Sequence, residues 1–378
     1  MVLGPALQDR SSVFLTGATG LIGGEVARRL VDSGVDKLWT LVRPTRDASP
    51  AARLAERFGM NLLRSTHATS HALRPVAGDL VEPALGLSAT DADEVRNEAD
   101  VIIHSAAETS FIRANSCVKT NVTGVERLLE FVRGCKRAPL LVYISTAYTA
   151  GVSRNEIIHE DHGCRPDSQH FNEYTRSKAV AEQLVRNSGL RVLVVRPSIV
   201  LSAGLTSRVF ARAILWFVPL LRDLDAVPVD PNAKADVVTV QFVAESIIEL
   251  LRSESLPYDT YNISAGAEVS STYRELSRIT DAVCQRLAPL NLIDPREWTR
   301  ELHKHFIRSP LQRKIFMGLR AYLPFLNMNV LFDNTRLRET LGDRCPVNKP
   351  LHVYLSDLLH LVVPEPGRTA LPERAPSR

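Results

Sequence analysis

Residues 12–25 read S-V-F-L-T-G-A-T-G-L-I-G-G-E, and we expect the rest of the chain to be organised around them. The apolar run at 13–15 favours a buried parallel strand, and a helical pattern follows from about Leu21. Gly17, Gly20 and Gly23 lie between the two at three-residue spacing. That spacing allows a tight turn, a close backbone approach to a pyrophosphate and close packing of the helix on the sheet.

The start of this helix would present free backbone N–H groups to an anion. We therefore interpret the stretch as a dinucleotide-binding turn. The residues expected to contact the dinucleotide are Gly17, Thr19, Gly20, Leu21, Ile22 and Gly23. Taken alone, three such glycines also fit a turn in any α/β protein, so the flanking sequence has to support the assignment.

The residue after the second strand indicates which dinucleotide is bound, because it reaches the adenosine ribose. This strand is expected at 38–42, and Arg43 follows it, with Arg46 and Arg53 nearby. An NAD enzyme usually has a carboxylate here, whereas guanidinium groups suit a 2′-phosphate. The sequence thus favours NADPH; arginines that only solvate a loop are the alternative.

Two further strand ends carry residues expected beside the dinucleotide. A short strand ends with Gly78-Asp79-Leu80, where the Asp79 carboxylate can accept from the adenine amine. Small side chains follow the strand at 101–104 and let the backbone lie against the cofactor; they are Ser105, Ala106 and Ala107. His104 ends that buried strand, and we interpret it as a structural histidine.

The stretch N-E-Y-T-R-S-K-A-V-A-E at 172–182 has a helical pattern with Tyr174 and Lys178 four residues apart. This spacing places both side chains on one helix face. A free tyrosine has a pKa near 10, and an adjacent ammonium moves it toward neutral pH by stabilising the phenolate. On its own the spacing is typical of many surface helices, so its weight comes from the motifs that precede it.

Taken together, the motifs resemble the extended short-chain dehydrogenase/reductase superfamily, and more narrowly its fatty acyl-CoA reductase and thioester reductase branch. The similarity runs from about residue 10 to about residue 265. It is carried by T-G-A-T-G-L-I-G, L-V-R-P, G-D-L-V-E-P-A-L-G-L-S, H-S-A-A-E-T-S-F, Y-I-S-T-A-Y, N-E-Y-T-R-S-K-A-V-A-E and V-V-R-P-S-I-V. The G-D-L-x-x-P-x-L-G-L-S and S-T-A-Y segments separate this branch from sugar epimerases better than the glycines do.

This resemblance implies the roles of three catalytic residues. Thr146 would hydrogen-bond the reacting carbonyl oxygen, Tyr174 would donate the proton, and Lys178 would orient the nicotinamide ribose. Pro197 and Ile199, in the buried strand at 192–201, should lie by the nicotinamide. The implied reaction is the NADPH-dependent reduction of an acyl thioester, presented by CoA or by a carrier protein, to an aldehyde or an alcohol.

Two other functions remain open from the sequence. The same threonine, tyrosine and lysine also serve NAD(P)-dependent dehydrogenases or epimerases of secondary alcohols, such as sterols or nucleotide sugars. A non-catalytic dinucleotide sensor would need only the binding turn, so an intact catalytic set argues against it.

Composition narrows the function classes. The 46 basic and 42 acidic residues are mixed along the chain, which gives no support to nucleic-acid binding. Five scattered cysteines without a C-x-x-C pair suggest neither a zinc site nor a disulfide framework, and a reduced cytoplasmic setting fits them best. In the polar stretch 153–171, three histidines lack a recurring ligand spacing, so we expect a loop over the active site and no metal.

The expected architecture is a Rossmann-type, doubly wound parallel α/β sheet with a smaller, mostly helical substrate lobe. The NADP-binding domain is predicted at 8–265, with a lobe insertion at about 203–234 in which an apolar segment lines an acyl tunnel or forms core. The C-terminal lobe is predicted at 266–363 and a disordered tail at 364–378. Basic residues between 297 and 326 predict an amphipathic helix for an acidic carrier, CoA phosphates or peripheral membrane contact, with a solvated face as the alternative.

Overall fold

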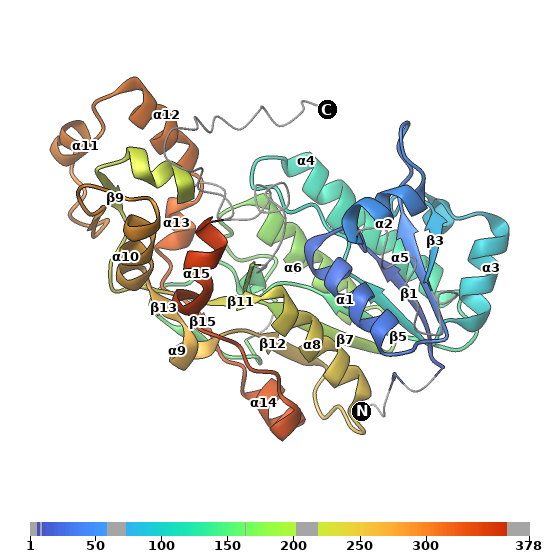
Figure 1. Ribbon diagram of the computed structural model, residues 1–378. Coiled ribbons are helices and arrows are strands. Elements are labelled where there is room, and N and C mark those ends of the chain that lie inside the picture. Colours follow the sequence, from blue (N-terminus) through green and yellow to red (C-terminus); the bar gives the residue numbers. More distant parts are fainter. Residues whose placement is uncertain (1–5, 8–9, 59–72, 163, 202–217, 361–378) are drawn as a thin grey trace. The chain divides into compact units, whose positions relative to one another are not determined.

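The computed structural model describes residues 6–7, 10–58, 73–162, 164–201 and 218–360 (Figure 1). The predicted tail at 364–378 and the apolar segment up to residue 217 lie outside these ranges. The chain forms two compact units. The sheet unit comprises Met1–Val200, Asp236–Val269 and Val330–Asn348, and the small unit comprises Leu201–Ala235, Ser270–Asn329 and Lys349–Arg378.

A parallel seven-stranded sheet forms the centre of the sheet unit, with strand order β12-β7-β5-β4-β1-β2-β3. The strands are β1 (Ser12–Thr16), β2 (Lys37–Val42), β3 (Leu73–Ala77), β4 (Val101–His104), β5 (Leu140–Ile144), β7 (Val192–Pro197) and β12 (Thr260–Ile263). The strand order reverses between β1 and β4. In open α/β sheets, ligands bind at the carboxyl ends of the strands next to such a reversal.

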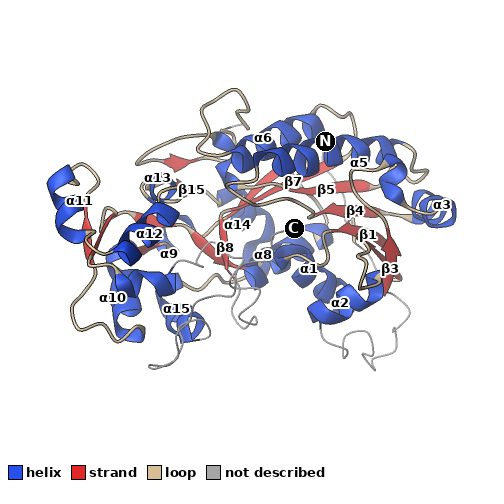
Figure 2. Cartoon of the chain, turned by 90° about the horizontal axis from the view of Figure 1, so that it is seen from above, coloured by secondary structure: helices blue, strands red, loops and turns tan. Residues whose placement is uncertain are grey.

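Helices cover both faces of this sheet, as Figure 2 shows. On one face Val13 and Leu15 pack with α1 (Leu21–Asp32) and α8 (Val240–Arg252). On the other face Phe14 and Ile102 pack with α3 (Ala89–Glu98), α5 (Gly124–Arg133) and α6 (Glu173–Arg186). Alternate residues of one strand therefore enter different cores, which is why the strands read as continuous apolar runs. The predicted doubly wound fold is confirmed.

Shorter elements complete the sheet unit. They are α2 (Pro50–Phe58), η1 (Pro83–Gly86), α4 (Ala114–Cys117), the π turn η2 (Val118–Thr123), η3 (Ala147–Ala150), β6 (Ile157–Ile158), β8 (Ile199–Leu201), β11 (Val237–Thr239), α9 (Gly266–Val269), β15 (Leu331–Phe332), α14 (Thr335–Leu341) and η5 (Gly342–Arg344). The helix expected at 120–132 thus contains a π turn, and the strand expected at 192–201 is interrupted at Ser198.

The segment Val330–Asn348 belongs to the sheet unit, whereas the sequence placed it in the C-terminal lobe. Strand β15 pairs with β6, and the ring of Phe332 lies 4.9 Å from the ring of Tyr148. The buried Asp236 carboxylate also accepts from the backbone N–H of Phe332 at 3.0 Å. These contacts join residues far apart in the chain, so no local pattern predicts them.

The small unit combines helices with short strand pairs. Its elements are η4 (Val218–Asp223), β9 (Ala226–Pro228), β10 (Lys234–Ala235), β13 (Ser271–Thr272), α10 (Tyr273–Val283), β14 (Asn291–Ile293), α11 (Arg300–Phe306), α12 (Pro310–Leu319), α13 (Leu323–Leu326) and α15 (Leu351–His360). The basic segment expected as one amphipathic helix therefore forms three. Among the described residues, no helix has the length and apolar character needed to cross a membrane.

Candidate active site

The glycine turn links β1 to α1, and at Gly17 and Gly23 it leaves no room for a side chain. Gly17 has φ +79°, and a Cβ there would lie 2.5 Å from the backbone N of Ala106. A Cβ on Gly23 would lie 2.3 Å from the carbonyl oxygen of Gly17. Gly20 caps α1 and donates to that same carbonyl at 2.8 Å. This close backbone cradle at a helix start fits the pyrophosphate of a dinucleotide.

The loop after β4 is fastened to the end of β1. Ser105 donates its backbone N–H to the carbonyl of Thr16 at 3.2 Å, and the N–H of Ala106 reaches the Thr16 hydroxyl at 3.3 Å. The structure therefore brings Ser105 and Ala106 against the glycine turn, and Ala107 follows them on the same loop. Thr19 lies on this turn, Leu21 and Ile22 begin α1, and all three residues are half-buried.

His104 is buried next to the glycine turn. Its Nδ1 is 2.7 Å from the Thr16 hydroxyl, and its ring stacks on Tyr143 with centroids 5.7 Å apart. Burial lowers the pKa of His104 to about 3, and the nearby Lys178 charge lowers it further. A neutral, hydrogen-bonded imidazole at this place supports the structural interpretation.

The predicted adenosine end lies at the carboxyl ends of β2 and β3. Arg43 is exposed, and its guanidinium is 3.7 Å from the Asp79 carboxylate. Arg53, on α2, donates to the backbone carbonyl of Arg43. The structure thus brings together these three residues, while the neighbouring Leu80 is buried in the core below α5.

Tyr174 lies in the first turn of α6. This helix begins after Asn172, whose side chain accepts from the backbone N–H of Thr175 at 2.9 Å. The Thr146 hydroxyl lies close enough to the phenol to affect its ionisation, and the Tyr174 ring stacks near that of Phe111 with centroids 6.2 Å apart. Burial raises the pKa of Tyr174 to about 12, while the nearby Thr146 hydroxyl opposes this shift.

Thr146 follows β5 and begins the short helix η3. Its side chain is 5% exposed, accepts from the backbone N–H of Tyr148 at 3.4 Å and donates to the carbonyl of Pro197 at 3.5 Å. Two predicted catalytic hydroxyls and the predicted nicotinamide neighbour Pro197 therefore meet at the carboxyl edge of the sheet. Ile199, the other predicted neighbour, is half-buried in β8.

Lys178 is one turn after Tyr174 on α6 and is almost completely buried. Its Nζ donates to the carbonyl of Ile144 at 2.7 Å and lies 4.2 Å from the centroid of the Tyr143 ring. Burial lowers the pKa of Lys178 to about 7, and the charge of Glu182 opposes that shift. The tuning of Tyr174 by this ammonium stays a prediction.

Sequence reasoning missed Asn121, which lies in the π turn η2 and is buried. Its amide donates to the Ser177 hydroxyl at 2.9 Å and to the carbonyl of Glu108 at 3.0 Å, and its oxygen accepts from the Glu108 N–H at 2.8 Å. Asn121 therefore fastens the helix α6 to the loop after β4. A buried asparagine within an apolar helical pattern was the available signal.

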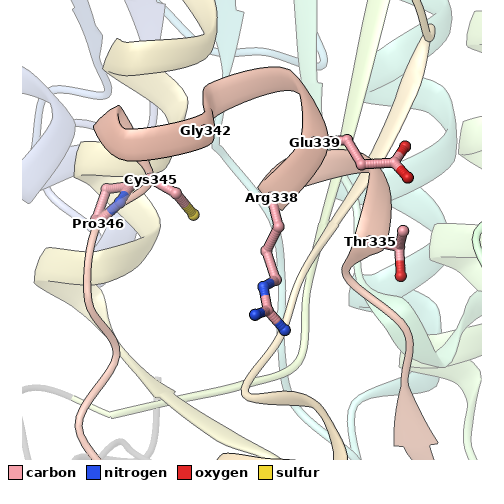
Figure 3. A pocket seen from close by; sticks show the side chains of 6 residues that line it. All are labelled: Thr335, Arg338, Glu339, Gly342, Cys345 and Pro346. Carbon is pink, nitrogen blue, oxygen red and sulfur yellow. The ribbon is translucent and has the colours of Figure 1, made fainter.

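A separate open hollow of about 560 Å³ is lined by α14 and the residues after it (Figure 3). Arg338 and Cys345 point into it. Its lining contains none of the predicted catalytic or dinucleotide-binding residues. We therefore place the candidate active site at the sheet edge and not in this hollow.

Comparison with known proteins shows the family of this chain. A family model described as male sterility protein matches residues 15–247, more than half of the chain and all the motifs from the glycine turn to Lys178. The chain belongs to this family. The branch inferred from the motifs, the thioester reductases among the extended short-chain dehydrogenase/reductases, is thereby confirmed.

The sequence identity to individual relatives is below 30% in the two examples that follow. A linear gramicidin synthase of Brevibacillus parabrevis is 29% identical over 254 residues, which are 64% of this chain and 5% of that protein. A putative fatty acyl-CoA reductase of Drosophila melanogaster is 28% identical over 228 residues, covering 52% of this chain and 42% of that one. This chain thus spans less than half of either relative. The crystal structure of the terminal R domain from the myxalamid PKS-NRPS biosynthetic pathway matches 95% of this chain and 93% of its own, with 25% identity and a TM-score of 0.76.

Proposed function

We propose that this chain is an NADPH-dependent reductase of acyl thioesters. The observation that carries the proposal is the closeness of the Thr146 and Tyr174 hydroxyls at the carboxyl edge of the sheet, with Lys178 buried one helical turn away. Relatives named as a fatty acyl-CoA reductase and a linear gramicidin synthase support a thioester substrate.

The residues of this site suit carbonyl reduction. When bound, the dinucleotide supplies the hydride that the carbonyl carbon receives. The hydroxyls of Thr146 and Tyr174 would then donate to the carbonyl oxygen, where negative charge develops, and Tyr174 would give up its proton. Lys178 would orient the nicotinamide ribose. Collapse of the resulting hemithioacetal expels the thiol and leaves an aldehyde, and a second round would give the alcohol.

We propose NADPH as the reductant on the basis of Arg43 and Arg53. Both lie at the predicted ribose end, and a guanidinium pairs with a phosphate through charge-assisted hydrogen bonds. The backbone cradle around Gly17 and Gly23 would hold the pyrophosphate.

The small unit offers a surface for an acidic or phosphorylated substrate carrier. Helices α11 and α12, the segment between them and the residue after α12 expose basic side chains; these are Arg300, Lys304, Arg308, Arg313, Lys314 and Arg320. Leu311 and Met317 on α12 are 52% and 76% exposed. We propose acyl-CoA or an acyl carrier protein as partner; peripheral membrane contact and a cytoplasmic setting stay predictions.

The test is the decay of nicotinamide absorbance with purified protein, NADPH or NADH, and acyl-CoA thioesters of increasing chain length. We expect NADPH consumption that depends on acyl length. A carrier-protein-bound acyl series run in parallel separates the two forms of delivery. If no thioester is reduced while a sterol or nucleotide sugar is turned over, the secondary-alcohol enzyme replaces the proposal; dinucleotide binding without any turnover would indicate the sensor.

A further inference from the structure

Glu182 lies on α6 one turn after Lys178, and its side chain is completely buried. One carboxylate oxygen, Oε1, accepts from Arg196 at 2.6 Å and from Arg186 at 2.9 Å. The other, Oε2, accepts from the Ser145 hydroxyl at 2.6 Å. A buried carboxylate needs such partners, because an unpaired charge is strongly disfavoured away from water.

Glu182 contacts residues that precede and follow Thr146 in the chain, and also a residue next to Pro197. Ser145 directly precedes Thr146, and the Thr149 hydroxyl also reaches Oε2, at 3.5 Å. Arg196, 3% exposed, directly precedes Pro197, whose carbonyl accepts from Thr146. The carboxylate thus connects the catalytic helix with the ends of β5 and β7.

We propose that Glu182 is a positioning residue of the active site, which fixes Thr146 through Ser145 and places a negative charge one helical turn from Lys178. Stability alone is a weak reason for such a group, because apolar residues often replace a buried ion pair without loss. Glu182 is bonded to the residue before Thr146 and lies one helical turn from Lys178, which links it instead to the candidate active site.

The charge of Lys178 depends on the groups around it. His104 on β4 is neutral, Tyr143 on β5 presents its ring, and Tyr174 is a neutral phenol on the same helix. Glu182 is the group that raises the pKa of Lys178 against the effect of burial. Replacing its carboxylate by an amide would leave the positive charges of Arg196 and Arg186 and remove the negative one.

Two variants separate the effect of the Glu182 charge on Lys178 from the positioning of Thr146. Glu182→Gln removes the charge, and we expect kcat to fall by more than KM rises, with the alkaline limb of the kcat–pH profile moved to lower pH by about one unit. Ser145→Ala leaves the charge and removes only the bond next to Thr146, so kcat should fall severalfold with the limb unmoved. Glu94→Gln is the matched control: Glu94, on α3, is ion-paired with Arg74 and Lys37 at the β2–β3 edge of the sheet.

This inference rests on the proposed function, so a readout without turnover accompanies the kinetics. With lysine labelled at Cε, NMR titration of the cofactor-free protein follows Lys178, whose signal is identified by its loss in Lys178→Arg. We expect a lower pKa in Glu182→Gln and the wild-type value in Ser145→Ala and Glu94→Gln. A wild-type pKa in Glu182→Gln overturns the charge effect, and full kcat in Ser145→Ala overturns the positioning effect. A wild-type protein without thioester activity overturns the proposed function, while the titration still decides the charge effect.

Discussion

The hydroxyls of Thr146 and Tyr174 lie close together, although Thr146 follows strand β5 and Tyr174 is in the first turn of helix α6. A carbonyl oxygen placed between them would receive two hydrogen bonds. Removing either hydroxyl should therefore affect the reaction more than the fold.

Tyr174→Phe should lower kcat/KM by about 10²- to 10⁴-fold, because a positioned proton donor contributes that much to the rate. Dinucleotide affinity, measured by fluorescence titration, should change little. Tyr258→Phe is the control, since that phenol bonds Glu339 at 3.4 Å on the surface. Activity retained in a Tyr174→Phe, Lys178→Ala double variant would refute the mechanism.

Arg43→Ala should raise the KM for NADPH by roughly 10- to 100-fold and leave the KM for NADH nearly unchanged. A charge-assisted hydrogen bond is worth about 1.5–3 kcal/mol, and each 1.4 kcal/mol is tenfold in affinity. Arg28→Ala, which breaks ion pairs with Glu25 and Asp32 on α1, serves as control. Equal losses with both reductants would contradict a 2′-phosphate site.

Gly17→Ala should destabilise the protein by about 3 kcal/mol or more and abolish dinucleotide binding, because backbone strain and the contact with Ala106 add together. Gly34→Ala is a matched control: its φ is +77°, and a Cβ there would meet nothing within 4 Å. It should cost only about 1–2 kcal/mol, which is the strain of the left-handed backbone. Urea unfolding compares the two, and equal costs would show that the close approach is unimportant.

Acid should destabilise the protein partly through His104. In the unfolded chain this imidazole takes up a proton near pH 6.5, whereas in the folded protein burial lowers its pKa to about 3. Between these values the unfolded state binds more protons, so stability falls with falling pH by up to about 1.4 kcal/mol per pH unit.

His104→Asn should reduce that slope while keeping a partner for Thr16. Glu160 acts in the opposite sense: burial raises its pKa to about 7, so below neutral pH the folded state binds the extra proton. Glu160 is present in both proteins, and the difference between their unfolding curves at pH 4–7 therefore isolates His104. Parallel curves would mean that His104 is already protonated in the fold.

Local sequence patterns predicted the sheet and its loops well. Strands β4 and β5 have the predicted bounds, because both faces of the sheet are covered and each strand is an uninterrupted apolar run. The pattern around Asn121 predicted a plain helix, since a π turn keeps the apolar stripe and differs only in one extra residue per turn.

Local sequence patterns could not predict the buried polar network around Glu182. Glu182 reads as one of many glutamates on a helix, and Arg196 as the charged end of a strand. Their pairing depends on α6 packing over β5 and β7, a relationship between segments that periodicity does not encode. The place of Val330–Asn348 in the sheet unit also depends on contacts between distant segments, so local patterns could not predict it.

Because Val330–Asn348 belongs to the sheet unit, the order of the two units along the chain limits how the protein can evolve. The chain passes between the two units after residues 200, 235, 269, 329 and 348, so neither unit is a continuous stretch of the gene. A single recombination event cannot exchange the small unit for that of a relative; a cut after residue 329 would also remove β15 and the N–H that satisfies Asp236. New properties in the small unit should therefore arise by point substitution, with the sheet unit and the small unit evolving as one piece.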